Sequence, residues 1–199
     1  ILNNIINEFP KDLAINGEVY NNKAEKKVTL NKTEQFSETT NNFINFLNSN
    51  FFIKYLQKLT SIKETLIPDP LLIGGGLHEL KNNGHLNIHS DFNRHPNTKL
   101  DRRLNVLIYL NKNWKEQYGG ELQLWDKNMT ACYKKILPIF NRMVVFSTTD
   151  FSYHGNPTKV NNPNNISRKS IAMYYYSNGR PSHEVELGDH STIFRKRPG

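Results

Sequence analysis

The sequence predicts a mainly β fold preceded by helices, and three observations support this. Between residues 37 and 60, apolar residues recur three and four positions apart, which is typical of helices that pack one side on a core. After Pro68 and Pro70, short runs rich in Val, Ile, Leu, Phe and Tyr alternate with Gly, Asn and Pro. Many short strands separated by turn residues indicate a sandwich or barrel.

The helical part is expected to hold two helices. Ser37 is a candidate cap for the first, and the apolar side chains on its packed side are Phe43, Ile44, Phe46 and Leu47. The second carries Phe52, Tyr55, Leu56 and Leu59 in the same spacing. Residues 1 to about 35 are polar and irregular apart from a short strand expected at residues 18–20.

The β part is expected to hold strands at residues 85–89, 104–110, 121–125, 143–147 and 170–176. The turn residues between them include Asn82-Asn83-Gly84 and Gly119-Gly120. We expect one domain over residues 1–199, with a helical support region at 1–70, the β core at 71–181 and a C-terminal tail at 182–199.

Length and composition fit a single soluble domain. The chain has 199 residues, of which 37% are hydrophobic, enough for one substantial core. It contains no apolar run long enough to span a membrane and no visible signal peptide. The single cysteine, Cys132, excludes an intrachain disulfide and a cysteine-based metal site, so we expect it to be structural and the compartment to be the cytoplasm.

The net charge of +8 raises the question of nucleic-acid binding. The basic residues are dispersed, apart from short clusters at residues 23–27, 102–103 and 195–197. The chain is also rich in Asn, Lys and Ile, a bias that genome composition alone can produce. We therefore expect solvated surface charge, with nucleic-acid binding as the lesser alternative and no membrane association.

A candidate metal site begins with the triplet His89-Ser90-Asp91. On a strand, side chains two positions apart point to the same side, so His89 and Asp91 can address one metal ion. His154 is the best third ligand, because it follows the apolar run at residues 143–146. Two imidazoles and one carboxylate leave three metal positions open, as non-haem Fe(II) oxygenases require. Taken singly, such a triplet occurs often by chance, and a lone histidine is usually packed in a core.

Arg168 is the candidate anchor for a 2-oxo acid bound to that metal. A guanidinium binds a carboxylate through two parallel hydrogen bonds, which an ammonium group does not. Strand alternation places Arg168, Ser170, Ala172 and Tyr174 on one face and directs Lys169 to the other.

Residues 74–181 resemble the 2-oxoglutarate/Fe(II) dioxygenases of the prolyl-hydroxylase type. The resemblance includes the metal triplet, the distal histidine and the arginine. It also includes segments that bind no metal: Ile-Tyr-Leu-Asn-Lys-Asn-Trp at 108–114, Gly-Gly-Glu-Leu at 119–122, Asn-Arg-Met-Val-Val-Phe at 141–146 and the strand at 168–174. The similarity to the oxygen-sensing prolyl hydroxylases is particularly close at residues 108–122.

This resemblance implies a double-stranded β-helix (a jelly roll, cupin-like) with Fe(II) between its two layers. It implies 2-oxoglutarate as cosubstrate, dioxygen as the oxidant and ascorbate as a reductant. Tyr109 matches the tyrosine that hydrogen-bonds the cosubstrate carboxylate, while core packing is the alternative role. Leu107 shares its face by alternation, and Leu122 and Tyr174 are expected to line the same pocket.

The sequence departs from the family pattern just before the first ligand. The family has a tyrosine there, whereas this chain has His78-Glu79-Leu80, which leaves one wall of the cosubstrate pocket undefined. For the substrate we expect contacts from Arg94, in the loop after the triplet, and from His78 and His85. The glycines at 74–76 are expected to allow a tight turn or a close backbone approach.

The expected reaction is hydroxylation of an unactivated C–H bond, with release of succinate and CO2. The substrate is expected to be a prolyl residue or a related amino acid in a peptide. The same chemistry on a small molecule or a glycan-linked substrate is one alternative, and a non-catalytic jelly-roll binding module is another. A serine hydrolase is disfavoured, since no Gly-x-Ser-x-Gly motif occurs.

Overall fold

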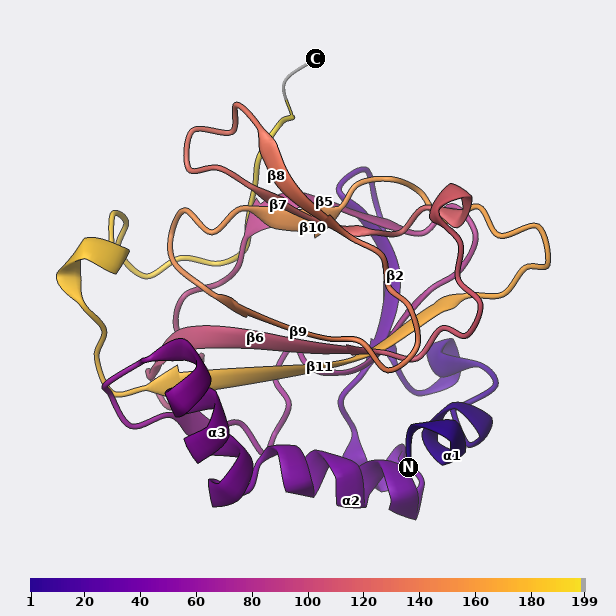
Figure 1. The fold of residues 1–199 in the computed structure, drawn as a ribbon, viewed down its shortest axis with the longest axis horizontal. Coiled ribbons are helices and arrows are strands. Elements are labelled where there is room, and N and C mark those ends of the chain that lie inside the picture. The colour runs from indigo at the N-terminus through magenta and orange to yellow at the C-terminus, as the bar shows by residue number, and fades with distance from the viewer. Residues whose placement is uncertain (198–199) are drawn as a thin grey trace.

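Twelve strands form one curled sheet in the computed structural model, which describes residues 1–197 (Figure 1). The strands are β1 (Glu18–Asn21), β2 (Glu25–Leu30), β3 (Ile67–Pro68), β4 (Gly76–Leu80), β5 (His85–Ser90), β6 (Asp101–Tyr109), β7 (Leu122–Trp125), β8 (Cys132–Ile136), β9 (Met143–Ser147), β10 (His154–Asn156), β11 (Arg168–Ser177) and β12 (Ile193–Phe194). Their order is β8-β7-β10-β5-β2-β4-β11-β6-β9, with β1, β12 and β3 attached to β2, β5 and β11.

The sheet folds into two layers that β2 joins. Strands β8, β7, β10 and β5 form one layer, and β11, β6 and β9 form the other (Figure 1). The first half of β2 pairs with β5, where Glu25 lies opposite Leu86, and its second half pairs with β4, where Val28 lies opposite Glu79. This is the double-stranded β-helix that the sequence predicted.

The helices cover the outer face of the β11–β6 layer. They are α1 (Leu2–Asn7), α2 (Glu38–Leu47) and α3 (Asn50–Thr60), and the short 3-10 turns are η1 (Leu13–Ile15), η2 (Thr33–Gln35), η3 (Glu116–Tyr118) and η4 (Ser182–Glu184). Ser37 caps α2 by accepting a hydrogen bond from the backbone N of Thr40 at 3.2 Å, as predicted. Ser49 caps α3 in the same way through Phe52.

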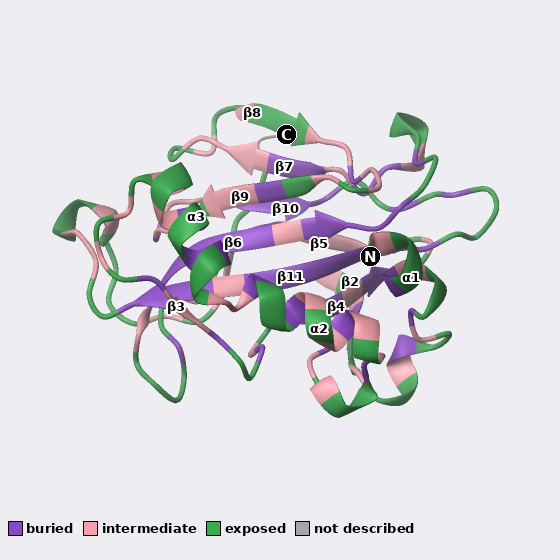
Figure 2. Ribbon diagram, turned by 60° about the horizontal axis from the view of Figure 1, so that its bottom comes forward, coloured by how far each residue is buried: buried purple, intermediate pink, exposed green. Residues whose placement is uncertain are grey.

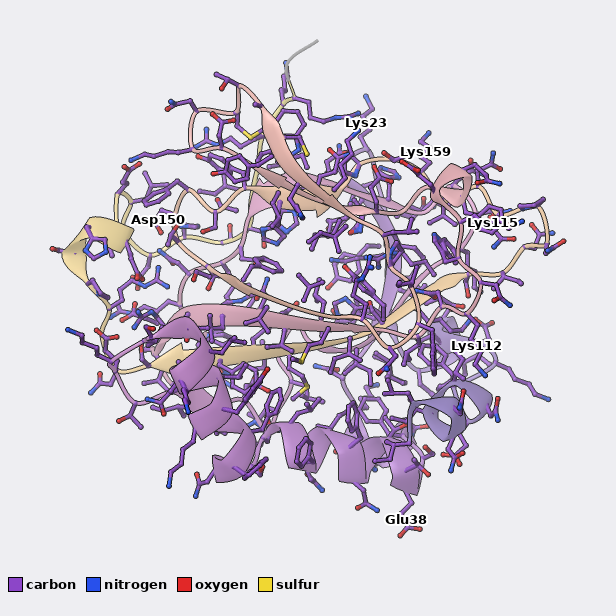
Figure 3. All side chains as sticks on the ribbon, viewed as in Figure 1. Lys23, Glu38, Lys112, Lys115, Asp150 and Lys159 are labelled. Atoms are coloured by element: carbon purple, nitrogen blue, oxygen red, sulfur yellow. The ribbon has the colours of Figure 1, made fainter. Side chains whose placement is uncertain are left out.

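Strand alternation divides the long strands β6 and β11 between two environments. One face packs against the helices in the main core and carries Leu104, Val106, Ile108, Ile171, Met173 and Tyr175. The other face points between the two layers and carries polar groups, among them Asn105 and Arg168. Figure 2 shows both strands largely buried, and Figure 3 shows side chains filling the space between the layers. The site therefore lies inside the curl, away from the helical core.

Gly76 shows why the predicted turn at residues 74–76 needs glycine. Its φ is +88°, and a Cβ atom at this position would lie 2.3 Å from the carbonyl oxygen of Leu30. The contact brings the start of β4 against the end of β2, so only glycine allows these two neighbouring strands to approach this closely.

Strands also occur on both sides of the region expected to hold the β core. Residues 1–70 are not only a helical support, because β1, β2 and β3 lie there and β2 is central to the sheet. Strand β2 was missed because its first half, Glu25-Lys26-Lys27, has no apolar alternation, whereas β1 confirms the strand expected at 18–20. The described part of the tail contributes η4 and β12, and residues 198–199 lie outside the described residues. No helix within residues 1–197 has both the length and the apolar character that a membrane crossing requires.

Candidate active site

His89, Asp91 and His154 come together at one end of the curled sheet. His89 on β5 lies directly opposite His154 on β10, and their ring centroids are 4.5 Å apart. The Nε2 atom of His89 is 3.4 Å from Oδ1 of Asp91, and Nε2 of His154 is 3.2 Å from Oδ2. One ligand atom from each residue lies within 4.8 Å of the others, so the three groups predicted from sequence converge on one point.

Backbone carbonyls fix the orientation of both imidazoles. Nδ1 of His89 lies 2.8 Å from the carbonyl oxygen of Asn87, and Nδ1 of His154 lies 2.9 Å from that of Ser152. Because a carbonyl only accepts, each Nδ1 carries the proton and each Nε2 offers its lone pair to a metal. Burial, followed by the nearness of His154, lowers the pKa of His89, which keeps this ligand neutral.

Asp91 is held by two side chains of β6. Asn105 donates a hydrogen bond from Nδ2 to Oδ2 of Asp91 at 2.7 Å, and Nη2 of Arg102 lies 3.2 Å from the same oxygen. Burial alone raises the pKa of Asp91, but the charge of Arg102 and the contacts with both histidines hold it well below its ordinary value. Asp91 is therefore an ionised ligand with a fixed orientation.

The donor set fits a mononuclear Fe(II) site. Two neutral imidazoles and one carboxylate supply one negative charge, and three ligands leave several coordination positions for exogenous groups. Cys132, the one cysteine of the chain, lies on β8 outside this cluster. His95 and His190, by contrast, are engaged with Asp69 and Asp150, at 3.6 Å and 3.0 Å.

A cavity of about 70 Å³ adjoins the three ligands and leads to Arg168. Leu107, Leu122 and Tyr174 line it, as the sequence predicted. Arg168 is only 3% exposed, and its Nε donates a hydrogen bond to the carbonyl oxygen of Gly120 at 2.8 Å. Its Nη2 lies 3.4 Å from the hydroxyl of Tyr109, a fully buried residue that reaches the cavity through this contact.

The Gly119-Gly120 pair is needed to seat that arginine. Both glycines have positive φ, +65° and +68°. A Cβ atom on Gly120 would lie 3.0 Å from Cδ of Arg168, and the Gly120 carbonyl is the acceptor for Nε. A side chain at position 120 would therefore displace the arginine.

The wall that the sequence left undefined is formed by His78. It lines the cavity, whereas Glu79 points to the other side of β4, where it contacts Ser167 Oγ at 2.5 Å and Lys169 Nζ at 3.5 Å. Burial, with the positive charges of Lys27 and Arg168, lowers the pKa of His78 to about 3. At this wall the cavity therefore presents a neutral imidazole.

Two expected substrate residues lie elsewhere, unlike His78. Arg94 is exposed and forms an ion pair with Asp189 at 3.0 Å, because the C-terminal segment crosses the loop after the triplet. His85 was expected on the same face as His89, but the pairing of β5 with β10 is irregular between His89 and Leu86. As a result Leu86, and not His85, shares the cavity with His89.

Sequence reasoning missed Arg102, Asn105 and Lys27. Asn105 lies two positions from Leu107 on the inner face of β6, so the alternation that indicated Leu107 also pointed to it. Lys27 lines the cavity from β2, and no sequence signal located it because β2 itself was not predicted.

A jelly roll that brings two histidines and an aspartate together, with a buried arginine nearby, is the arrangement expected of a 2-oxo acid-dependent, mononuclear non-haem iron oxygenase. The model of the 2OG-Fe(II) oxygenase superfamily matches residues 75–176, just over half of the chain, and the chain belongs to this superfamily. Its cofactors are Fe(II) and 2-oxoglutarate. None of the curated proteins searched matches the chain.

Solved structures share the fold at low sequence identity. A prolyl-4-hydroxylase from Pseudomonas putida is 13% identical with a TM-score of 0.56, over 84% of this chain and 80% of that one. A Trichoplax adhaerens prolyl hydroxylase, in complex with a hypoxia inducible factor peptide fragment, is 19% identical with a TM-score of 0.54, over 89% and 76%. HygX from Streptomyces hygroscopicus, with nickel, 2-oxoglutarate and hygromycin B bound, is 10% identical with a TM-score of 0.54, over 96% and 88%.

Proposed function

We propose that this oxygenase hydroxylates a prolyl residue, or a related amino acid, in a peptide and releases succinate and CO2. The similarity of residues 108–122 to the oxygen-sensing prolyl hydroxylases supports this substrate class. The prolyl hydroxylases among the structural neighbours have the same fold, which is compatible with the proposal.

The environment of Arg168 is the main support for a dicarboxylate as the cosubstrate of this enzyme. The hydrogen bonds of its side chain go to the Gly120 carbonyl and the Tyr109 hydroxyl, both uncharged. Burial lowers the pKa of Arg168, which means that the protein surrounding disfavours its charge. An anion bound at the closed end of the cavity would offset that penalty. The far carboxylate of 2-oxoglutarate fits this position, because its 2-oxo acid end would then reach the metal ligands.

In this proposal, the metal ligands and three other residues of the cavity have defined tasks. His89, Asp91 and His154 would hold Fe(II), which when bound would supply the activation of dioxygen and the oxidation of the C–H bond. Arg168 binds the far carboxylate of the cosubstrate, and Leu107 and Leu122 exclude water from its carbon chain. Positioning of the cosubstrate near the metal converts its oxidation into an intramolecular event.

The test is succinate formation by the purified protein with Fe(II), ascorbate and 2-oxoglutarate, in the presence of proline-containing peptides. The expected result is peptide-dependent succinate and a mass increase of one oxygen atom in the peptide. The matched control is His154→Ala, which removes one ligand and leaves the cosubstrate cavity in place. Succinate no higher than in this control, across all substrates tried, would contradict the proposal.

Two alternatives give different results in the same experiment. Hydroxylation of a small molecule or a glycan-linked substrate is supported by the fold shared with HygX, which was solved with hygromycin B bound. In that case succinate formation would respond to the small molecule and not to peptides. A non-catalytic binding module would form no succinate, but it would have no use for a buried guanidinium facing a metal site.

A further inference from the structure

A second hollow lies beside the metal ligands, on the far side of His154 from His89. Its volume is about 300 Å³, within the range of small-ligand sites. It lies between the ends of β7 and β9 and the connection that leads into β10. The hollow shares two wall residues, His154 and Phe146, with the cosubstrate cavity. A group bound here would therefore contact the same histidine that holds the metal.

The topology explains why the molecule is open on this side. The edge strands of the curled sheet are β8 in one layer and β9 in the other, and within the described chain the two are not hydrogen-bonded to each other. The opposite side is joined by β2 (Figure 1). Beside His89, β12 extends the sheet, and the ring of Phe194 lies 5.6 Å from the imidazole. Access to the metal is thus favoured next to His154.

The walls of the hollow are aromatic. Trp125, Tyr133, Phe151 and Tyr153 line it together with Phe146. The indole N–H of Trp125 is already engaged, donating to Oε1 of Gln123 at 3.1 Å, so the indole offers mainly its ring surface to a ligand. Tyr133 lies at the rim and is 68% exposed, so its ring leaves a large apolar surface in contact with water.

The charges of the hollow disfavour a cationic ligand. Of the described side chains that line it, none is a carboxylate, and the one charged group is Lys127. Lys127 is paired with Glu186 of the C-terminal segment and lies 4.4 Å from the ring centre of Phe151. A polyamine or an aminosugar would meet a cation whose counter-charge, Glu186, is already paired with it, whereas an uncharged saturated ring meets flat apolar surfaces.

We propose that this hollow binds the primary substrate, a peptide segment whose proline ring packs against Trp125 and Tyr133 beside His154. The inference rests on the proposed function, and it adds the location of the substrate and the groups that select it. Proline-rich segments are preformed in an extended helix and bind aromatic-lined grooves at low entropic cost. The hollow adjoins the metal site, because His154 and Phe146 form walls of both cavities, and a ring bound against His154 would lie near the metal.

The experiment measures binding and not turnover. A blocked alternating proline–alanine peptide is titrated by calorimetry into the Fe(II)- and 2-oxoglutarate-loaded protein under nitrogen, with a serine–alanine peptide of equal length as the reference ligand. The variants are Trp125→Ala and Tyr133→Ala. The matched control is Tyr55→Ala, which removes another exposed tyrosine, on α3. In a Trp114→Phe background, Trp125 is the sole tryptophan, so quenching of its fluorescence reports contact directly.

We expect the proline peptide to bind the parent protein and quench Trp125, and the serine peptide to bind more weakly. Each hollow variant should weaken peptide binding about tenfold, a loss typical of one aromatic contact plus its buried area. Binding of 2-oxoglutarate to the same variants should stay unchanged, which also shows that they are folded. Tyr55→Ala should resemble the parent protein.

Equal peptide affinity in the parent protein and in both hollow variants would show that the peptide does not bind in this hollow. Absence of peptide binding, or binding of hygromycin B that Trp125→Ala abolishes, would overturn the substrate class. Failure of the proposed function has a different signature, because it appears in the parent protein as absence of peptide-dependent succinate formation, whereas a wrong location leaves peptide-dependent succinate formation intact. The two failures are therefore distinguishable.

Discussion

Replacement of Arg168 by glutamine tests the cosubstrate assignment quantitatively. The substitution removes a buried guanidinium from the closed end of the cavity and leaves a neutral group that can still donate toward Gly120. Loss of one partner from a buried, hydrogen-bonded charge pair costs about 3–5 kcal/mol. At about 1.4 kcal/mol per factor of ten, the dissociation constant of 2-oxoglutarate should rise by about two to three and a half orders of magnitude.

The stability of the cosubstrate-free protein separates this role from a structural one. Because burial lowers the pKa of Arg168, its charge is disfavoured by the fold itself. Arg168→Gln should therefore leave the thermal stability of the cosubstrate-free protein equal or higher, while it removes the stabilisation that added 2-oxoglutarate provides. A purely structural arginine would show the reverse, a lower melting temperature with unchanged ligand affinity.

The assay is calorimetric titration of 2-oxoglutarate into the Fe(II)-loaded protein under nitrogen, with thermal unfolding in parallel. Lys112→Gln is the matched control, because it also removes one positive charge, from an exposed side chain (Figure 3). Arg168→Lys keeps the charge but not the paired hydrogen bonds, so about a tenfold loss is expected. An unchanged dissociation constant in Arg168→Gln would refute the assignment.

Three further predictions concern single side chains. Tyr109→Phe removes the hydroxyl beside Arg168 and should weaken 2-oxoglutarate binding by about two- to tenfold, the net contribution of one hydrogen bond, measured in the same titration; no change would show that the hydroxyl is idle. Burial lowers the pKa of His78 from 6.5 to about 3, so the unfolded chain takes up a proton below about pH 6.5 that the folded protein does not. The free energy of unfolding of the metal-free protein, measured with denaturant, should therefore fall by about 2 kcal/mol from pH 7 to pH 5 because of His78. The His78→Gln variant should lose correspondingly less stability over this range. Parallel pH profiles of stability for the two proteins would contradict the lowered pKa. Leu104 is fully buried under the helices, and Leu104→Ala should lower the free energy of unfolding by about 3 kcal/mol without changing 2-oxoglutarate affinity. A loss below about 1 kcal/mol would show that neighbouring side chains close the cavity that the substitution leaves.

The parts of the site that sequence could predict are those fixed by local strand geometry. His89 and Asp91 are two positions apart on one strand, and Arg168 and Tyr174 lie on one face of another, so alternation alone places them. Even this reasoning is wrong for His85, because the β5–β10 pairing is irregular just there. Alternation holds only while the pairing is regular.

The parts that could not be predicted depend on contacts between distant segments. Arg94 binds Asp189 and not a ligand, and nothing near Arg94 in the sequence indicates that partner. Lys27 reaches the cavity because β2 inserts between β4 and β5, a pairing set by backbone hydrogen bonds that charged side chains conceal. Trp125 reaches the open edge only through the curl of the whole sheet, which no local pattern indicates.

The place of β2 has a consequence for how the protein can be divided. A fragment starting at residue 71 would retain the three metal ligands and Arg168 but would carry two bare edges, on β4 and on β5. Unpaired strand edges recruit strands from other molecules, and here one of them is the strand that carries His89. Residues 25–30 thus cover the edge of β4 and the start of β5, while β12 covers the part of β5 that carries His89. A fragment without β2 is expected to associate through these exposed edges.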